Sequence, residues 1–226
     1  TDVIKNLQAI KPDIFIEFRQ KYVGPAMRKF GNMLRAFDCP GDGTMNRIRI
    51  ADIRMLCGNT AVHSDMVTWH DDEPVEIAAL QLINTLFGVP QLSMFISKAS
   101  FEHKKMIAFY TDYWNKNADL LMNGDFTPYR PLANYPLQKV TNAEKAIFGV
   151  YDAYVLDLED INNEFHILNG QITDSVIIRN ANDFEDYQCS VYDCQGLLIG
   201  EKTISLNKGI LEVAIPPCGI LIGRKA

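Results

Sequence analysis

The chain has 226 residues, of which 47% are hydrophobic and 22% are charged, and its formal net charge is −6. This length allows one sizeable domain or two small ones, and the composition is that of an ordinary soluble globular protein. The acidic balance provides no basic surface for nucleic acid, and no apolar run approaches the roughly 20 residues of a transmembrane helix, so neither nucleic acid nor a membrane is expected as a partner.

The first half of the chain alternates between helical and strand patterns. An amphipathic helix closed by Pro12 comes first, Pro74 begins a later helix, and Ser100 caps a long helix that ends near Gly124. Four short apolar runs predict buried strands, at 14–18, from Met33, at 61–67 and at 92–96. A helix followed by four strand–helix units indicates a parallel α/β arrangement.

The pattern changes from Asp125 onwards. Pro128, Pro131 and Pro136 mark a linker-like crossing, and beyond Val140 the sequence has no helical periodicity. Candidate strands, separated by turns, lie at 153–158, 175–178, 189–192, 210–215 and 219–222. We therefore expect an antiparallel β-domain, of the sandwich type, over residues 128–226.

The loop after the strand at Met33 is the most informative segment. It reads Asp38-Cys39-Pro40-Gly41-Asp42-Gly43-Thr44, and Thr44 is placed to cap a helix whose apolar Met45, Ile48 and Leu56 recur at helical spacing. In barrels of such strand–helix units, the chemistry lies on loops at the carboxyl ends of the strands. Asp42 is therefore a candidate catalytic carboxyl. Taken alone, Gly-Asp-Gly is also a common tight turn or a fragment of a calcium loop.

A closed barrel needs eight strands, so four predict either an open sheet or half of a barrel. Residues 11–70 resemble the retaining α-galactosidases of glycoside hydrolase family 36, in the clan shared with families 27 and 31. Lys11-Pro12-Asp13-Ile14-Phe15-Ile16-Glu17 resembles the start of their fifth strand, and Cys39-Pro40-Gly41-Asp42-Gly43-Thr44 resembles the acid/base motif on their sixth. The likeness continues from Ile53 to Gly58-Asn59-Thr60-Ala61, at the seventh strand.

The resemblance implies a mixed fold, α/β plus all-β: the second half of a (β/α)₈ barrel over residues 1–127, then the β-sandwich. It implies Asp42 as the general acid/base. The family's nucleophile lies in a Lys-x-Asp motif on strand four, which we expect before Thr1. Cys39 stands where the family has Trp, and Phe18-Arg19-Gln20 stands where α-galactosidases have Cys-Ser-Gly-Gly, so the sugar stays open.

Seven further residues are predicted to contact the sugar, from their places at strand ends: Glu17, Arg19, Arg35, Asp38, His63, Asp65 and Trp69. Arg35 and Asp38 could equally form a structural ion pair, and Trp69 could equally be plain packing. Asp52 is expected on a solvated helix face, whereas Trp114, Tyr110 and Tyr113 are expected in the core. His63, Asp65 and His70 could together form a metal site, but catalysis by a carboxyl pair needs no metal, so we expect none here.

The sequence thus predicts a fragment of a retaining α-galactosidase-like hydrolase, acting on an oligosaccharide or glycan without a cofactor. An α-glycosidase of the same clan with another sugar, such as α-N-acetylgalactosamine or α-glucose, and a non-catalytic carbohydrate-binding protein are the alternatives. The unpaired edges of a half barrel predict a homodimer.

Two features of the chain bear on its compartment. Its five cysteines are odd in number and lack CxxC spacing, so we expect buried or idle thiols rather than disulfides or metal ligands. The chain begins with Thr1 rather than Met, so we expect a processed or excised piece, and periplasmic, secreted and lysosome-like locations all stay open.

Overall fold

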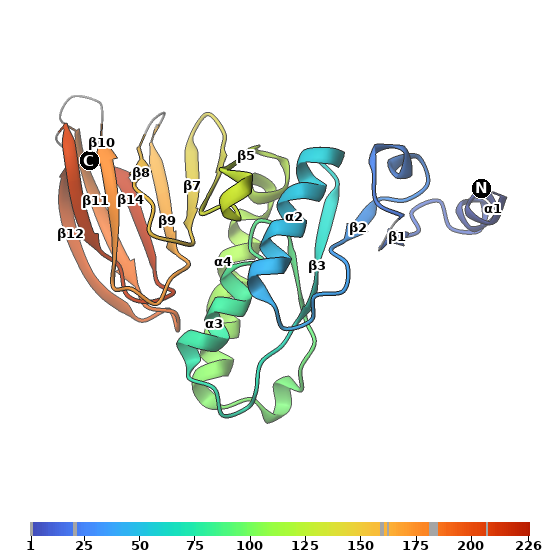
Figure 1. Cartoon of the computed structure of the whole chain (residues 1–226), viewed down its shortest axis with the longest axis horizontal. Helices are drawn as coiled ribbons and strands as arrows, with labels where there is room; N and C mark the ends of the chain where they lie inside the picture. The colour runs from blue at the N-terminus through green and yellow to red at the C-terminus, as the bar shows by residue number, and fades with distance from the viewer. Residues whose placement is uncertain (1, 20–21, 159–160, 162, 181–184, 207) are drawn as a thin grey trace.

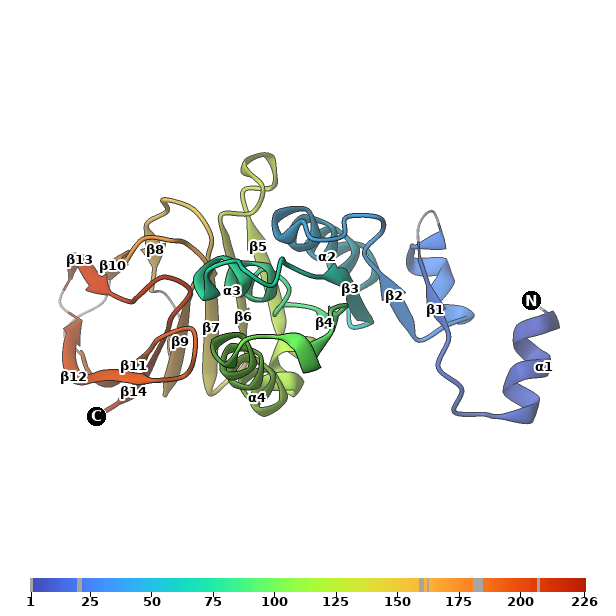
Figure 2. The ribbon, with the colours of Figure 1, turned by 90° about the horizontal axis from the view of Figure 1, so that it is seen from below.

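The chain folds into a helix-covered parallel sheet followed by a region of two further sheets, the β-region (Figure 1). The computed structural model describes residues 2–19, 22–158, 161, 163–180, 185–206 and 208–226. Helix α1 and the N-terminus lie at one end of the elongated molecule, and the C-terminal strands lie at the other (Figure 2). Helices α2, α3 and α4 lie between these two ends.

The parallel sheet has the strand order β1-β2-β3-β4, and every neighbouring pair is parallel. Its strands are β1 (Glu17–Phe18), β2 (Met33–Arg35), β3 (Ala61–Val67) and β4 (Val89–Leu92). The helices are α1 (Asp2–Ile10), α2 (Gly43–Cys57), α3 (Val75–Ile83) and α4 (Phe101–Asn123), with short 3₁₀ turns η2 (Pro25–Lys29), η3 (Ile96–Lys98) and η4 (Pro131–Ala133).

Several predicted boundaries are confirmed and two are wrong. Strand β3 has the predicted bounds, and Ser100 caps α4 by accepting a hydrogen bond from the His103 backbone N–H at 3.1 Å. Strand β1 begins only at Glu17. Strand β4 covers residues 89–92 instead of 92–96, because Val89 is the residue in register with His63 on β3.

The buried face of α2 differs from the predicted one. Met45 and Ile48 are half-buried and Leu56 is exposed, while the buried residues include two arginines. Arg47 lies 4.3 Å from the centre of the Tyr151 ring. Arg54 likewise lies 4.0 Å from the Phe126 ring and donates to the Phe87 carbonyl at 2.6 Å. Arginine stems pack well against apolar and aromatic surface, so an apolar pattern could not reveal this face.

The β-region is a mixture of antiparallel and parallel pairs. One sheet has the order β12-β11-β14-β9-β7-β6-β5 and the other β13-β10-β8. Its strands are β5 (Asp125–Tyr129), β6 (Leu137–Thr141), β7 (Lys145–Val150), β8 (Leu156–Asp157), β9 (Glu164–Asn169), β10 (Ser175–Asn180), β11 (Glu185–Tyr192), β12 (Leu198–Leu206), β13 (Gly209–Ala214) and β14 (Ile220–Lys225).

The prediction of a purely antiparallel β-domain is therefore wrong in part. Strands β7 and β9 pair in parallel, as do β8 and β10. A crossing segment, rather than a hairpin, joins each of these pairs, so the second strand runs in the direction of the first. The sequence also missed β5, β6, β7, β9 and β12 as separate strands.

One apolar core joins the helices to the β-region. It contains Leu82 of α3, Tyr110 and Leu121 of α4, and Ile147 and Leu168 of the seven-stranded sheet. The expected boundary between residues 127 and 128 falls inside β5, which pairs with β6. That division of the chain stays a prediction.

Two further expectations concern burial. Tyr110 and Tyr113 are buried, as predicted, and all five cysteines are buried free thiols. Among the described residues, no helix is long and apolar enough to span a membrane.

Candidate functional site

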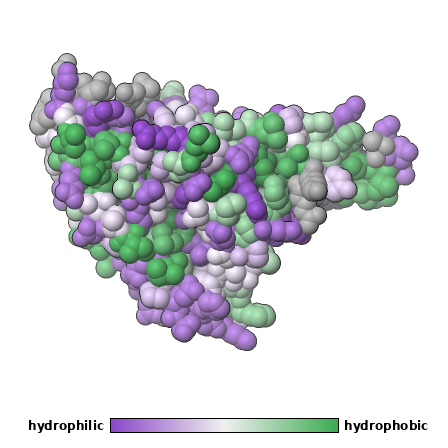
Figure 3. Space-filling view, viewed as in Figure 1, coloured by the Kyte–Doolittle hydropathy of each residue, from purple (hydrophilic) through white to green (hydrophobic). Residues whose placement is uncertain are grey.

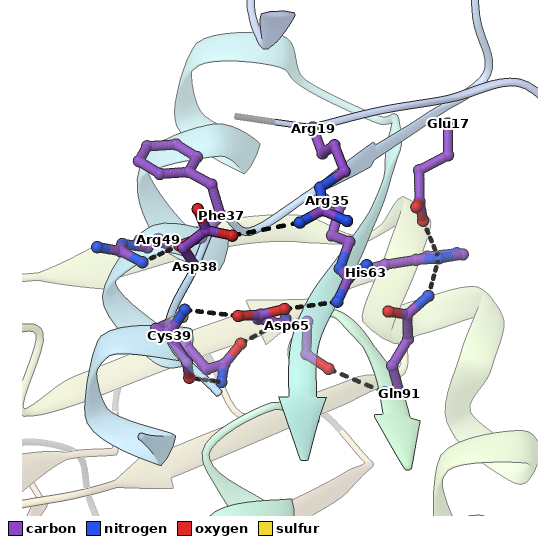
Figure 4. Close-up of polar contacts among 12 residues, drawn as sticks. Glu17, Arg19, Arg35, Phe37, Asp38, Cys39, Arg49, His63, Asp65 and Gln91 are labelled. Carbon is purple, nitrogen blue, oxygen red and sulfur yellow. Dashed lines mark hydrogen bonds and ion pairs between the residues drawn. The ribbon is translucent and has the colours of Figure 1, made fainter. Parts of the chain in front are cut away.

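A row of polar side chains lies on one face of the parallel sheet. Successive residues of a strand point to opposite faces, and Leu34 and Val62 face the apolar cluster that α2 covers. The side chains on the other face interact with one another across the strands (Figure 4). We call this set, Glu17, Arg35, His63, Asp65 and Gln91, the polar face.

Arg35 and Asp65 form the most buried pair of the polar face. Arg35 Nη2 donates to Asp65 Oδ1 at 2.5 Å, and the Asp65 side chain is only 3% exposed. Burial raises the pKa of Asp65, but hydrogen bonds from the Cys39 and Met66 backbone N–H groups and from Arg35 outweigh it and lower that pKa below its ordinary value. Asp65 is therefore a fixed carboxylate.

Asp65 also ties the β2–α2 loop to strand β3. Its Oδ2 accepts a hydrogen bond from the Cys39 backbone N–H at 2.5 Å. Asn46, in the first turn of α2, accepts from the Asp65 backbone N–H at 2.6 Å and donates to the Cys39 and Asp42 carbonyls at 3.2 Å each. The loop that bears Asp38 and Asp42 is thus held at both ends by buried hydrogen bonds.

Glu17, His63 and Gln91 form a second group on three strands. His63 Nδ1 lies 2.8 Å from Glu17 Oε1 and 3.1 Å from Gln91 Nε2. All three side chains are partly accessible. Carboxylate, imidazole and amide groups arranged in this way can exchange hydrogen bonds with the hydroxyls of a sugar.

Arg19 and Asp38 stand at the ends of β1 and β2, beside the polar face. Arg19 Nη2 lies 3.2 Å from Asp38 Oδ1, and the Asp38 side chain is 68% exposed. The alternative of an Arg35–Asp38 ion pair is wrong, because Arg35 pairs with Asp65 instead. Asp38 has a φ of 28°, a left-handed conformation that a non-glycine residue seldom adopts outside constrained sites.

Asp42 has a structural contact of its own. Its carboxylate accepts from the Met45 backbone N–H at 2.9 Å, so Asp42, and not Thr44, is the N-cap of α2. The side chain is exposed and lines a cavity between α2, α3 and the β-region. Neighbouring Cys39 is buried, which raises the pKa of its thiol to about 11 and keeps it neutral.

Trp69 lies in the core and is 8% exposed. Its indole N–H donates to His103 Nδ1 at 3.3 Å, and the two rings meet edge to face. The packing alternative therefore describes Trp69, and little of its ring is accessible to a pyranose. His63 and Asp65 are engaged with different partners, and among the described residues no three His, Cys, Asp or Glu side chains lie close enough to hold a metal ion.

Sequence reasoning missed three residues of this site. Asn46 holds the β2–α2 loop against β3, and Gln91 contacts His63. Arg49 donates to the Phe37 carbonyl, and its guanidinium lies 4.8 Å from the Phe37 ring centre. Asn46 follows Asp42 by four residues, one helical turn, which is the only sequence signal that could have linked the two.

Comparisons with known proteins place the fold rather than the activity. No protein-family model matches the chain, and no curated protein sequence matches it. The galactosidase domain of alpha-galactosidase-sucrose kinase, AgaSK, is similar over 100% of this chain, with a TM-score of 0.52 and 11% identity. This chain spans 31% of that structure's chain, about a third of its length.

Two other solved structures are less similar. A glycoside hydrolase family 44 endoglucanase of Clostridium acetobutylium ATCC 824 has a TM-score of 0.44 and 9% identity, with 99% of this chain and 59% of that chain covered. A glucosidase of Croceicoccus marinus has a TM-score of 0.40 and 9% identity, with 99% and 62% covered. The likeness to the AgaSK structure shows that this chain has the fold of one part of that galactosidase domain.

Proposed function

We propose that this chain is the acid/base half of a retaining α-galactosidase-like glycoside hydrolase. The observation that carries the proposal is the polar face of the parallel sheet together with the loop that bears Asp38 and Asp42. This loop follows Arg35, the last residue of β2, and barrel enzymes place their chemistry on loops at the carboxyl ends of the strands. The likeness to the galactosidase domain of AgaSK supports the fold that this requires. On this proposal the four strands are strands five to eight of a barrel, and an upstream strand supplies the nucleophile.

The polar face would hold the sugar. Arg35 and Asp65 present a fixed ion pair, and Glu17 and His63 present hydrogen-bonding groups that are partly open to solvent. A glycosidase pocket gains from such fixed groups, because they do not reorganise when charge develops in the transition state.

Two carboxyls of the β2–α2 loop compete for the acid/base role. Asp42 holds the position that the sequence motif predicts, but its carboxylate caps α2 and lines the cavity between α2, α3 and the β-region instead of the polar face. Asp38 precedes it on the same loop, directly after β2, and its exposed carboxyl stands beside Arg19. A retaining enzyme needs the acid/base about 5–5.5 Å from the nucleophile, so only one of the two can serve.

The test compares Asp38→Asn with Asp42→Ser in the complete enzyme. Serine is a good N-cap, so Asp42→Ser removes the carboxyl while leaving the helix capped. Loss of the acid should reduce hydrolysis of a natural α-galactoside by roughly 10²–10⁴-fold. It should spare the first step for an aryl α-galactoside, whose leaving group departs without a proton.

The variant that shows this split between the two substrates identifies the acid/base. Equal losses on both substrates in both variants would contradict the proposal. Hydrolysis of an α-glucoside or α-N-acetylgalactosaminide, with the same split, would keep the mechanism and change the sugar. Binding of a sugar without turnover in the complete protein would instead support a non-catalytic carbohydrate-binding protein.

A further inference from the structure

A separate polar cavity of about 750 Å³ lies between α2, α3 and the β-region. Asp42 and Gln81 line it from the side of the helices, and Tyr151, Asp152 and Gln171 line it from the side of the β-region. The polar face described above lies on the other side of the parallel sheet from the helices, so this cavity belongs to a different surface.

Arg47 anchors the cavity wall. It is 6% exposed, and it donates from Nη1 to Asn84 Oδ1 at 2.6 Å and from Nη2 to the Asn134 carbonyl at 3.0 Å. The guanidinium also stacks over the Tyr151 ring. Three elements that are distant in the sequence are thereby fixed around the cavity before any ligand arrives, which lowers the entropic cost of binding.

The backbone beside Arg47 is strained in the same place. Arg130, Asn134 and Tyr135 have φ values of 52°, 58° and 52°, all in the left-handed region. Asn134 lines the cavity, and Tyr135 is held by a hydrogen bond from its hydroxyl to Asp52 Oδ1 at 2.5 Å. For Arg130 and Tyr135 this conformation is costly, and such residues cluster at ligand sites, where the surrounding structure enforces them. Asparagine adopts it more readily.

The lining side chains define the chemistry of a ligand. Asp42 and Asp152 offer carboxylate acceptors, while Gln81 and Gln171 each offer an acceptor and a donor. A single cation, Arg47, does not outweigh two carboxylates, so the cavity does not favour an anion. The lining therefore suits an uncharged ligand whose groups both donate and accept hydrogen bonds. The hydroxyls of a polyol meet this requirement.

A second, more apolar cavity shares one lining residue with the polar cavity. Gln171 also lines a smaller cavity of about 230 Å³, together with Tyr154, Val155 and Ile177. A ligand that spans both would need hydroxyls at one end and an apolar face at the other. A pyranose chain has both, because its ring hydroxyls point outward and its C–H groups form an apolar face.

We propose that this cavity, with the smaller cavity that shares Gln171, is a second saccharide-binding site, distinct from the polar face. It rests on the cavity's own lining and does not depend on the chain being an enzyme. The expected ligand is a neutral sugar of one or a few units.

The test measures binding of galactose, glucose, sucrose and raffinose, with inorganic phosphate as the anionic probe, by titration calorimetry and saturation-transfer NMR. Asp152→Asn combined with Gln171→Ala removes two lining groups, and Ala133→Trp fills the cavity from its exposed rim. Gln188→Ala, an exposed glutamine on β11, is the matched control. Thermal unfolding checks that every variant is folded.

We expect at least one sugar to bind with a Kd of about 1 mM. Both cavity variants should raise this Kd by about tenfold or more. The control variant should bind as the parent does. The proposal is overturned if no sugar binds, if only phosphate binds, or if the two cavity variants leave binding unchanged. It is also overturned if Asp38→Asn, rather than the cavity variants, abolishes binding, because the sugar then sits on the polar face.

Discussion

At the residue scale, Asp65 decides the geometry of the candidate site. One carboxylate oxygen of Asp65 accepts from Arg35 on β2, and the other accepts from the Cys39 backbone N–H. The backbone N–H of Asp65 donates to the Asn46 side chain. Since a buried carboxylate is tolerated only when it is fully paired, these contacts form a unit in which each member requires the others.

We expect Asp65→Asn to lower the free energy of unfolding by about 3–5 kcal/mol, because it leaves Arg35 without its buried counter-charge. The matched control is Asp157→Asn, which breaks the more exposed ion pair with Arg179 and should cost about 0–1 kcal/mol. Urea unfolding at neutral pH measures both. Similar losses in the two variants would show that Asp65 contributes no more than a surface carboxylate.

The cap of α2 is tested by a second set of variants. Asp42→Ala should lower the free energy of unfolding by about 1 kcal/mol, because the Met45 backbone N–H loses its acceptor. Asp42→Ser should recover most of this loss. Thr44→Ala should have little effect, which separates the observed cap from the one that the sequence predicted.

At the scale of elements, a buried hydrogen-bond chain joins helix α4 to strand β9. The Tyr113 hydroxyl lies 2.8 Å from His166 Nδ1, and His166 Nε2 lies 2.8 Å from Glu164 Oε1. Lys145 and Arg224 also contact Glu164, at 2.7 Å and 2.8 Å. Burial lowers the pKa of His166. The pKa of Glu164 is also lowered, chiefly by the hydrogen bond from His166 and further by those from Lys145 and Arg224.

The hydrogen-bonded His166 and Glu164 predict how the free energy of unfolding depends on pH. Because the folded-state pKa of His166 is below its unfolded value near 6.5, the unfolded chain binds the proton first, and stability should fall as pH drops below about 6.5. The depressed pKa of Glu164 adds a further loss below about pH 4.5.

His166→Gln should flatten the upper part of this dependence, between about pH 6.5 and pH 5, because glutamine does not titrate. The readout is the urea midpoint at a series of pH values. His70→Gln, at an exposed histidine after β3, is the control and should keep the parent's slope. An unchanged slope in His166→Gln would assign the pH dependence to other groups.

At the scale of the whole molecule, the parallel sheet has two open edges. Strands β1 and β4 are its outermost strands, and each pairs on one side only among the described residues. Large exposed side chains with apolar or aromatic surface occur at the β1 and α1 end of the chain, among them Val3, Ile10, Phe15 and Tyr22. Figure 3 shows some green, hydrophobic surface at that end of the molecule. Open edges and apolar surface of this kind favour pairing with another chain.

We therefore expect the isolated chain to form a homodimer at micromolar concentration, with β1 of one copy beside β4 of its partner around a two-fold axis. Phe15→Lys should shift sedimentation towards the monomer. Ile210→Lys, at a similarly exposed apolar residue on β13, should not, since the two side chains are 75% and 73% exposed. A folded monomeric parent, or a dimer broken only by Ile210→Lys, would contradict this geometry.

Some features of this protein follow from the sequence alone because they rest on local chemistry. Ser100 caps α4 and Gly124 ends it, since each acts on backbone groups within one turn. Strand β3 and the buried cysteines were likewise predicted from runs of apolar residues and from the absence of paired Cys spacing. The parallel order of the first four strands follows from the alternation of strands and helices.

Tertiary structure decided which side chains meet. Arg35 pairs with Asp65 rather than Asp38 because register sets Arg35 beside His63 on β3, two residues before Asp65. Arg47 and Arg54 are buried because the β-region supplies aromatic rings over them, which no pattern within α2 could show. The parallel pairing of β7 with β9 likewise depends on the path of the chain between them. Long-range packing, and not the local sequence, sets which strands share hydrogen bonds.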